Sequence, residues 1–135
     1  MACRYDVGSG PLMHYTSDHT NLRLSSTLEQ ASVAKTKFQQ DSLLAVEMTL
    51  WYYPKGERGF RIRPDVASAW AAVAAAAAPL LANGSLIGFN LGDELVWNCL
   101  PPSELTAGVD LIRKSFPRGQ AVSRHNIAGI WVAFF

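Results

Sequence analysis

One stretch limits the possible folds of this chain more than any other: a continuous apolar run that ends in two acids. Residues 85–97 read Ser-Leu-Ile-Gly-Phe-Asn-Leu-Gly-Asp-Glu-Leu-Val-Trp. An apolar run bounded by turn-forming residues is typical of a parallel strand that is covered on both faces. In α/β folds, catalytic and binding groups gather in the loops at the carboxyl ends of such strands. The stretch therefore predicts an α/β protein with Asp93 and Glu94 at the functional edge of its sheet.

Length and composition indicate a single folded domain. The chain has 135 residues, of which 49% are hydrophobic and 17% are charged, and this balance excludes a disordered protein. A net charge of +1 gives no reason to expect a nucleic-acid partner. Cys3 and Cys99 fit neither a disulfide framework nor a zinc-binding spacing, and we expect no cofactor.

The sequence also argues against a membrane protein. The N-terminal residues lack the apolar segment of a secretory signal, so a cytoplasmic location is the default expectation. Residues 66–82 are nearly all alanine, which is only mildly apolar, and the run contains Pro79. A membrane span needs about 20 strongly apolar residues, so we expect no contact with a membrane.

Strand and helix signals alternate along residues 11–135, after a polar lead-in at residues 1–10. Strands are expected at 11–16, 43–51, within 85–97 and at 120–124, followed by an apolar ending at 127–135. Helices are expected at about 27–40, 66–82 and 103–116. Ser26 and Glu29 match a capping box for the first helix, and Ser103 is the expected cap of the third. This alternation predicts βαβ units and a parallel sheet.

The chain has room for about half of a (β/α)8 barrel, which needs roughly 200 residues or more. No GxGxxG follows the first expected strand, so a dinucleotide-binding fold lacks its fingerprint. Half a barrel would leave two open strand edges, which tend to pair with another chain. Three alternatives remain: a fragment of a longer barrel, a half-barrel that forms a homodimer through its open edges, or a small open sheet.

Acidic residues are the main candidates for catalysis. An acid at a strand end beside Phe89 and Trp97 would have a raised pKa and could act as a general acid or base. We favour Glu94 over Asp93 because its side chain reaches further. The alternative is that this pair caps a turn or binds an arginine. Glycoside hydrolysis needs a second carboxylate, for which the candidates are Glu47 in the 43–51 strand and Asp18.

Aromatic and polar residues near the expected strand ends are candidates for binding a ligand. Aromatic rings stack on sugars, although they pack equally well between strands and helices. The candidate substrate-binding residues are Trp97, Trp51, Tyr53, His14, Asp18 and Asn90. The histidines show no metal-binding spacing, so we expect no metal site. Four cations between 55 and 63 suggest either a solvated loop or, less directly, an anion site.

With these motifs in view, the chain resembles the (β/α)8 glycoside hydrolase-like proteins. The resemblance covers about residues 11–126 and depends mainly on Leu91-Gly-Asp-Glu94, with Ser17-Asp-His-Thr-Asn21 and the 43–51 strand. It implies an incomplete TIM-barrel-like fold in which Glu94 is the acid/base. Asp93 stands where these proteins usually have asparagine, no proline follows Glu94, and the later strands that carry the nucleophile of retaining enzymes are missing.

These observations predict a glycosidase-like hydrolase, or a fragment of one, that binds a carbohydrate and uses Glu94 as general acid/base. The alternative is a non-catalytic barrel remnant that binds a ligand or pairs with another chain. A third possibility is chemistry on a phosphorylated metabolite at the arginine-rich loop.

Overall fold

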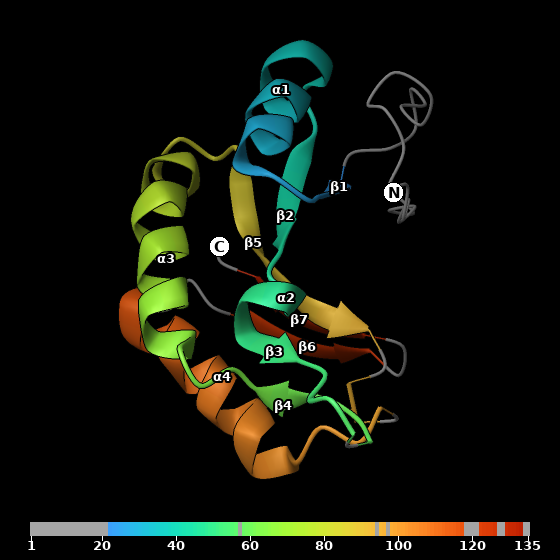
Figure 1. Ribbon diagram of the computed structural model, residues 1–135. Coiled ribbons are helices and arrows are strands. Elements are labelled where there is room, and N and C mark those ends of the chain that lie inside the picture. The colour runs from blue at the N-terminus through green and yellow to red at the C-terminus, as the bar shows by residue number, and fades with distance from the viewer. Residues whose placement is uncertain are drawn as a thin grey trace.

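The computed structural model describes residues 22–56, 58–93, 95–96 and 98–117, together with the backbone of 122–126 and 129–133. The polar lead-in and the strand expected at 11–16 lie outside these residues. The first described element is β1 (Leu22–Ser25), a strand in a segment where no strand was predicted. Figure 1 shows all elements in chain order.

Five strands form one sheet in the order β1-β2-β5-β7-β6. The first three, β1, β2 (Asp41–Ala45) and β5 (Leu86–Asp93), are parallel and follow chain order, which confirms the α/β prediction. The last two, β6 (Val122–Asn126) and β7 (Gly129–Ala133), pair antiparallel with each other, and β7 pairs antiparallel with β5. The expectation of a parallel sheet throughout was therefore wrong at this end. Two residues connect β6 to β7, and a parallel crossover needs a dozen or more.

The helix α1 (Leu28–Phe38) lies close to its expected position, but its cap differs by one residue. Thr27, and not Ser26, is the N-cap, and its Oγ1 accepts a hydrogen bond from the Gln30 amide at 3.1 Å. In return, Gln30 Oε1 accepts from the Ser26 amide at 2.9 Å. The predicted Ser26–Glu29 pair was wrong because Thr27 and Gln30 offer the same chemistry with the same spacing.

The segment expected as one strand at 43–51 is divided into three elements. β2 ends at Ala45, a single-turn helix α2 (Glu47–Leu50) follows, and β3 (Trp51–Tyr52) pairs with β4 (Arg61–Ile62) in a separate small sheet. The amides of Thr49 and Leu50 both donate to the Val46 carbonyl, which closes the helical turn. Glu47 therefore follows the strand and does not lie within it, which corrects the prediction.

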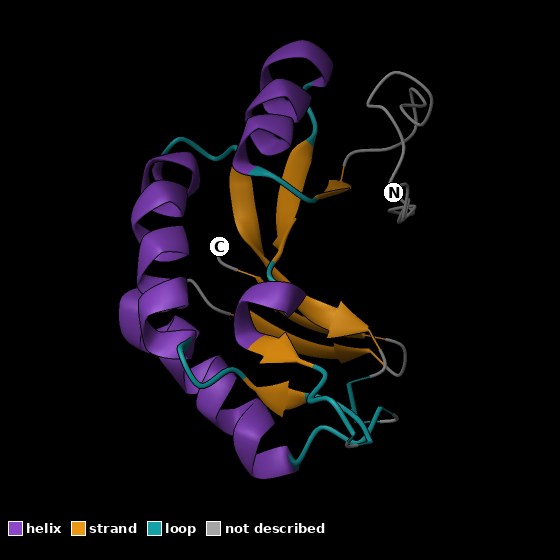
Figure 2. Ribbon diagram, in the orientation of Figure 1, coloured by secondary structure: helices purple, strands orange, loops and turns teal. Residues whose placement is uncertain are grey.

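Two long helices, α3 (Val66–Ala82) and α4 (Pro102–Ser115), lie along one side of the strands (Figure 2). α3 agrees with the expected range and continues three residues past Pro79. α4 begins after Pro101, and Ser103 does not cap it. Proline is well suited to the first helical turn because its missing N–H would have no helical acceptor there.

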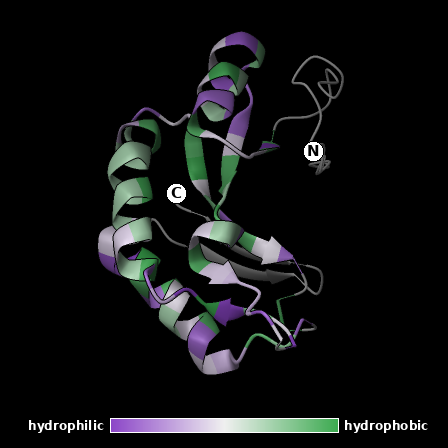
Figure 3. Ribbon diagram, in the orientation of Figure 1, coloured by the Kyte–Doolittle hydropathy of each residue, from purple (hydrophilic) through white to green (hydrophobic). Residues whose placement is uncertain are grey.

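An aromatic cluster joins both long helices to the sheet. Trp70 of α3 lies edge-on to Phe89 of β5, with ring centroids 5.0 Å apart, and Phe116 lies 5.7 Å from Phe89. The Trp70 indole also donates to the Ser115 hydroxyl at 2.8 Å. The hydrophobic colouring of β5 and of the alanine-rich α3 in Figure 3 fits this core. The core lies between helices and sheet, so the strand ends are left for other contacts.

Candidate functional site

The carboxyl ends of β2 and β5 lie at the same edge of the sheet because these two strands are parallel neighbours. Ala45 pairs with Asn90, and the Val46 amide donates to the Asn90 carbonyl at 2.9 Å. Beyond this last bond the two strands separate: β2 leads into α2, and β5 continues to Asp93. The residues that directly follow Ala45 and Asn90 in the chain are therefore close to each other in space.

Glu47 is the first residue of α2, and its half-buried side chain packs on Gly92 of β5. A Cβ atom added to Gly92 would lie 2.9 Å from the Cγ, Cδ and Oε1 atoms of Glu47. Gly92 also has a φ of +128°, which a residue with a side chain rarely adopts. Both the backbone conformation and the close approach of Glu47 therefore depend on glycine at position 92.

Asp93, the last residue of β5, is exposed next to this contact. The pKa of Glu47 is raised first by burial of its carboxyl group and second by the negative charge of Asp93. Both causes disfavour the ionised form of Glu47. In this pair of acids, burial and the neighbouring charge therefore favour the protonated form of Glu47.

The side chain of Asn90 bonds to the backbone at the end of β5, next to the acids Glu47 and Asp93. Its side chain is 8% exposed, and Oδ1 accepts from the Gly92 amide at 2.8 Å. This local bond coincides with an irregularity in the pairing of β5 with β7 between Asn90 and Gly92. Asn90, predicted from sequence as a substrate-binding residue, thus has a direct contact to the backbone of the site.

Trp51 connects the site to the helix layer. It is fully buried, and its indole N–H donates to the Leu91 carbonyl at 2.7 Å. On its other side, a Cβ added to Gly108 of α4 would lie 2.2 Å from Trp51 Cη2. Trp51 was predicted to bind substrate, and in this conformation its ring is packed between β5 and α4.

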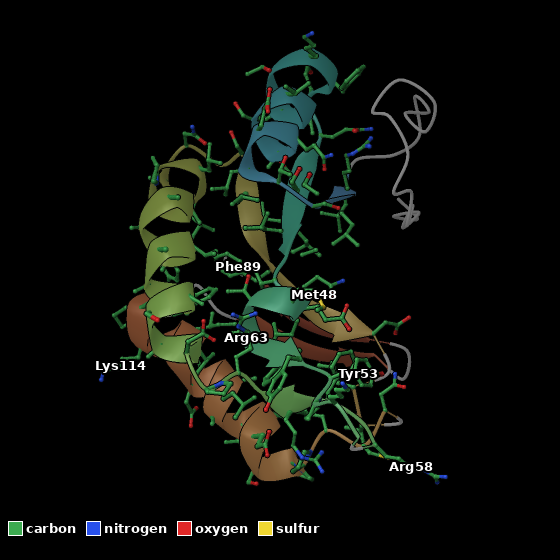
Figure 4. All side chains as sticks on the ribbon, in the orientation of Figure 1. Met48, Tyr53, Arg58, Arg63, Phe89 and Lys114 are labelled. Carbon is green, nitrogen blue, oxygen red and sulfur yellow. The ribbon has the colours of Figure 1, made fainter. Side chains whose placement is uncertain are left out.

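Tyr53, by contrast, is 54% exposed, and its ring lies 4.1 Å from that of Phe60. The Phe60 amide donates to the Asn98 carbonyl, so the loop that carries these rings is tied to the loop after β5. Figure 4 shows Tyr53 together with Met48 of α2. Among the described residues, the exposed large hydrophobic side chains all follow the carboxyl ends of strands: Met48, Tyr53 and Val96.

The structure thus brings Glu47, Asp93 and Asn90 together at one edge. Four other predicted site residues lie outside the described part of the chain: His14, Asp18, Glu94 and Trp97. Sequence reasoning did not identify Gly92, Met48 or Val96. The available signal for Gly92 was a glycine directly before an acid at the end of an apolar strand.

Two of the four cations of the basic loop, Arg61 and Arg63, make local contacts. Arg63 forms a salt bridge with Asp65 at 2.8 Å, and Arg61 donates to the carbonyls of Phe60 and Cys99. Within the described ranges, no group of three or more His, Cys, Asp or Glu side chains could hold a metal ion. In the same ranges, no helix has the length and apolar character that crossing a membrane requires.

Comparison of the chain with family models, with curated proteins and with solved structures gave no match.

Proposed function

We propose that the chain is a glycosidase-like hydrolase, or part of one, which acts on a carbohydrate at the carboxyl ends of β2 and β5. The observation that carries this proposal is the carboxyl pair, in which Glu47 packs on Gly92 beside Asp93 and has a raised pKa. Glycoside hydrolysis uses two carboxyl groups in different protonation states. Environments that separate the pKa values of two acids assign one of them the role of acid and the other that of base.

In this proposal Glu47 is the general acid and protonates the oxygen of the leaving group. Asp93, which is exposed, is the general base and takes a proton from the attacking water. The water oxygen bonds to the anomeric carbon while the glycosidic bond breaks, so the products are a free sugar and an alcohol. Glu94, to which the resemblance assigns the acid/base role, is the alternative proton donor.

Exposed apolar side chains that follow the ends of β2, β3 and β5 fit a carbohydrate ligand. A sugar ring has an apolar face that stacks on aromatic rings, and its hydroxyl groups bond to polar side chains. Tyr53 presents an exposed ring that is braced by Phe60. We propose that Tyr53 contacts the sugar, with Trp97 as a second aromatic contact.

The arrangement of β1, β2 and β5 supports a finer proposal about the fold. Consecutive parallel strands that are neighbours in chain order, with crossover helices that contact each other, are the repeating unit of a barrel. We propose that residues 22–93 correspond to a segment of a TIM-barrel-like protein. The antiparallel β6 and β7 depart from that pattern.

The experiment is a turnover assay on a panel of chromogenic glycosides with the variants Glu47→Gln, Asp93→Asn and Glu94→Gln. We expect Glu47→Gln to lower kcat about 10²- to 10⁴-fold, the usual contribution of a general acid. Asp110→Asn, an exposed acid of α4, is the matched control and should retain full activity. Equal activity of Glu47→Gln and wild type, with loss only in Glu94→Gln, would transfer the acid role to Glu94. Turnover unaffected by all three substitutions would refute the proposal.

A second candidate function is a non-catalytic module that binds a ligand or pairs with another copy of the chain. The observation that favours it is the sheet order, in which β1 and β6 are the outer strands. Among the described residues, no further strand pairs with either of them. Two measurements distinguish the hydrolase from the non-catalytic module: the molar mass from light scattering on a sizing column, and turnover of the glycoside panel. A dimer without any turnover supports the module, whereas a monomer that hydrolyses a glycoside excludes it.

A further inference from the structure

The outer strand β1 directs a cation into the covered face of the sheet. In β1, Arg23 and Ser25 are buried, whereas Leu22 and Leu24 are half-buried on the opposite face. Arg23 and Ser25 pair with Ser42 and Leu44 of β2. Because Leu44 belongs to the same buried cluster as Ala31 of α1, the arginine lies on the face that the helices cover.

Arg23 is 6% exposed, and its Nε–H has no hydrogen-bond partner among the described residues. The salt bridges of these residues involve other cations, Lys35 with Asp41 and Arg63 with Asp65. A buried guanidinium without an anionic partner is costly, because it has lost its hydration and gained no compensating bond. Among the described residues, Arg23 is thus a buried cation for which no carboxylate partner is present.

Hydroxyl groups lie next to this cation in the sheet. Ser42 is the direct neighbour of Arg23 in the register of β1 and β2, and it is fully buried. Its Oγ lies 3.1 Å from that of Ser25, which is also fully buried. One hydroxyl proton is used in that bond, and the other remains for a further acceptor.

We propose that Arg23 and Ser42 form a binding site for a small oxyanion, a carboxylate or phosphate group, at the outer edge of the sheet. The guanidinium fork binds two oxygens of such a group with two parallel hydrogen bonds, and the serine hydroxyl adds a third. The remaining exposed fraction of Arg23 and the position of β1 as outer strand provide access from the edge. Since Nε and the Ser42 hydroxyl are both enclosed, binding requires β1 to open locally at the edge of the sheet.

This site is separate from the carboxyl pair at the ends of β2 and β5, and it does not depend on the proposed hydrolase activity. Arg23 pairs with the second residue of β2, whereas Glu47 follows the last residue of that strand. The two charges therefore lie towards opposite ends of β2. A ligand at Arg23 would stabilise the edge of the sheet and would not reach Glu47.

The test compares thermal melts of the full chain in sodium phosphate, sodium acetate and sodium chloride at equal ionic strength. We expect phosphate to raise the Tm of the wild type by about 5 °C and to saturate, as binding to the folded state alone requires. Arg23→Met should lose this increase, while Arg113→Met, which removes an exposed arginine of α4, should keep it. For Ser42→Ala, the half-maximal increase in Tm should need a several-fold higher phosphate concentration.

Two further outcomes keep the test decisive. Phosphate also stabilises proteins by exclusion from their surface, so an equal increase in wild type and Arg23→Met would overturn the proposal. The Nε–H resonance of Arg23 in a ¹⁵N spectrum, identified by its loss in Arg23→Met, should shift with added phosphate. A shift that instead follows protein concentration, without added anion, would show that a carboxylate of a second copy occupies the site and would also overturn it.

Discussion

Two places in the same sheet hold charge, and they do so in opposite ways. At the carboxyl ends of β2 and β5, the half-buried acid Glu47 lies against Gly92 and beside the exposed Asp93. At the outer edge, the cation Arg23 is 6% exposed and stands next to the buried hydroxyl of Ser42. The first charge can be neutralised by a proton, as its raised pKa indicates. The second cannot, because a guanidinium stays protonated in proteins.

The difference shows how a sheet accommodates a charge at the ends of its strands and a charge on the covered face of an outer strand. A strand end opens into loops, where water lowers the cost of ionisation and where a substrate has access. A side chain on the covered face is surrounded by the helix layer, so its charge needs a bound partner. The acid pair is therefore suited to proton transfer, and the arginine to binding an anion.

The largest effect that we expect from a single substitution at either place is that of Gly92→Ala. It introduces a Cβ 2.9 Å from Glu47 at a φ of +128°, and it should lower the free energy of unfolding by about 3 kcal/mol. Gly84→Ala is the matched control: its φ is +74° and no atom lies within 4 Å of an added Cβ, so about 1 kcal/mol is expected. Urea unfolding measures both values.

Adding Glu47→Ala to Gly92→Ala tests the cause of that loss. If contact with the Glu47 side chain contributes to the cost, the double variant should recover part of the stability. The single variant Glu47→Ala is the reference. If Glu47→Ala costs the same free energy of unfolding in the Gly92→Ala variant as in the wild type, the contact between the added Cβ and Glu47 contributes nothing to the loss.

Arg23→Met should act in the opposite direction and stabilise the chain by about 1 kcal/mol in chloride buffer. Replacing a buried ion by an apolar side chain of similar length removes a desolvation cost. Urea unfolding is the measurement, and Arg113→Met should change the result by less than about 0.5 kcal/mol, because Arg113 is exposed. A large loss of stability in Arg23→Met would mean that the cation is already compensated in the folded protein.

The hydroxyl pair beside Arg23 should show strong coupling. Ser42→Ala leaves the buried Ser25 hydroxyl without its partner and should cost about 1 kcal/mol. The double variant Ser25→Ala with Ser42→Ala removes both polar groups, so its cost should be smaller than the sum of the single costs. A double-mutant cycle with thermal or urea unfolding checks this, and strict additivity would contradict it.

The smallest expected effect is the pH dependence caused by Glu47. Because its pKa is raised in the folded state, Glu47 favours folding while it is protonated, and this contribution is lost as pH rises above about 4. Glu47→Gln should therefore match the wild type near pH 4 and exceed its stability at pH 7, by less than about 1 kcal/mol because the group is partly solvated. Asp93→Asn should reduce the same pH dependence, as it removes the second cause of the shift.

Several elements were predictable from the sequence because the signals that form them are local. The helix at 66–82 follows from a run of good helix formers that ends at Gly84, whose φ is +74°. β5 follows from an apolar run that ends in an acid. The position of Asp93 at the end of a strand was predictable for the same reason.

Other features were not predictable, either because local signals were equivalent or because they depended on contacts between distant segments. Glu47 was expected inside a strand, but hydrogen bonds to Val46 close a helical turn there, and its side chain meets Gly92 from another strand. The cap of α1 was predicted one residue too early because two adjacent residue pairs had equivalent chemistry. The antiparallel direction of β6 and β7 was not predicted, since periodicity marks a strand but not its partner.

The sequence by itself determined the positions of α1, α3, α4 and β5, because helix-forming runs, glycines and apolar periodicity act within a few residues of one another. It also determined the α/β class, through the alternation of those segments. Only the tertiary structure decided which acids meet and which cation is buried. Pairing β2 with β5 brings Glu47 against Gly92, 45 positions later in the chain, and pairing β1 with β2 covers Arg23. Such contacts are set by strand register and helix packing, which no local pattern in the chain specifies.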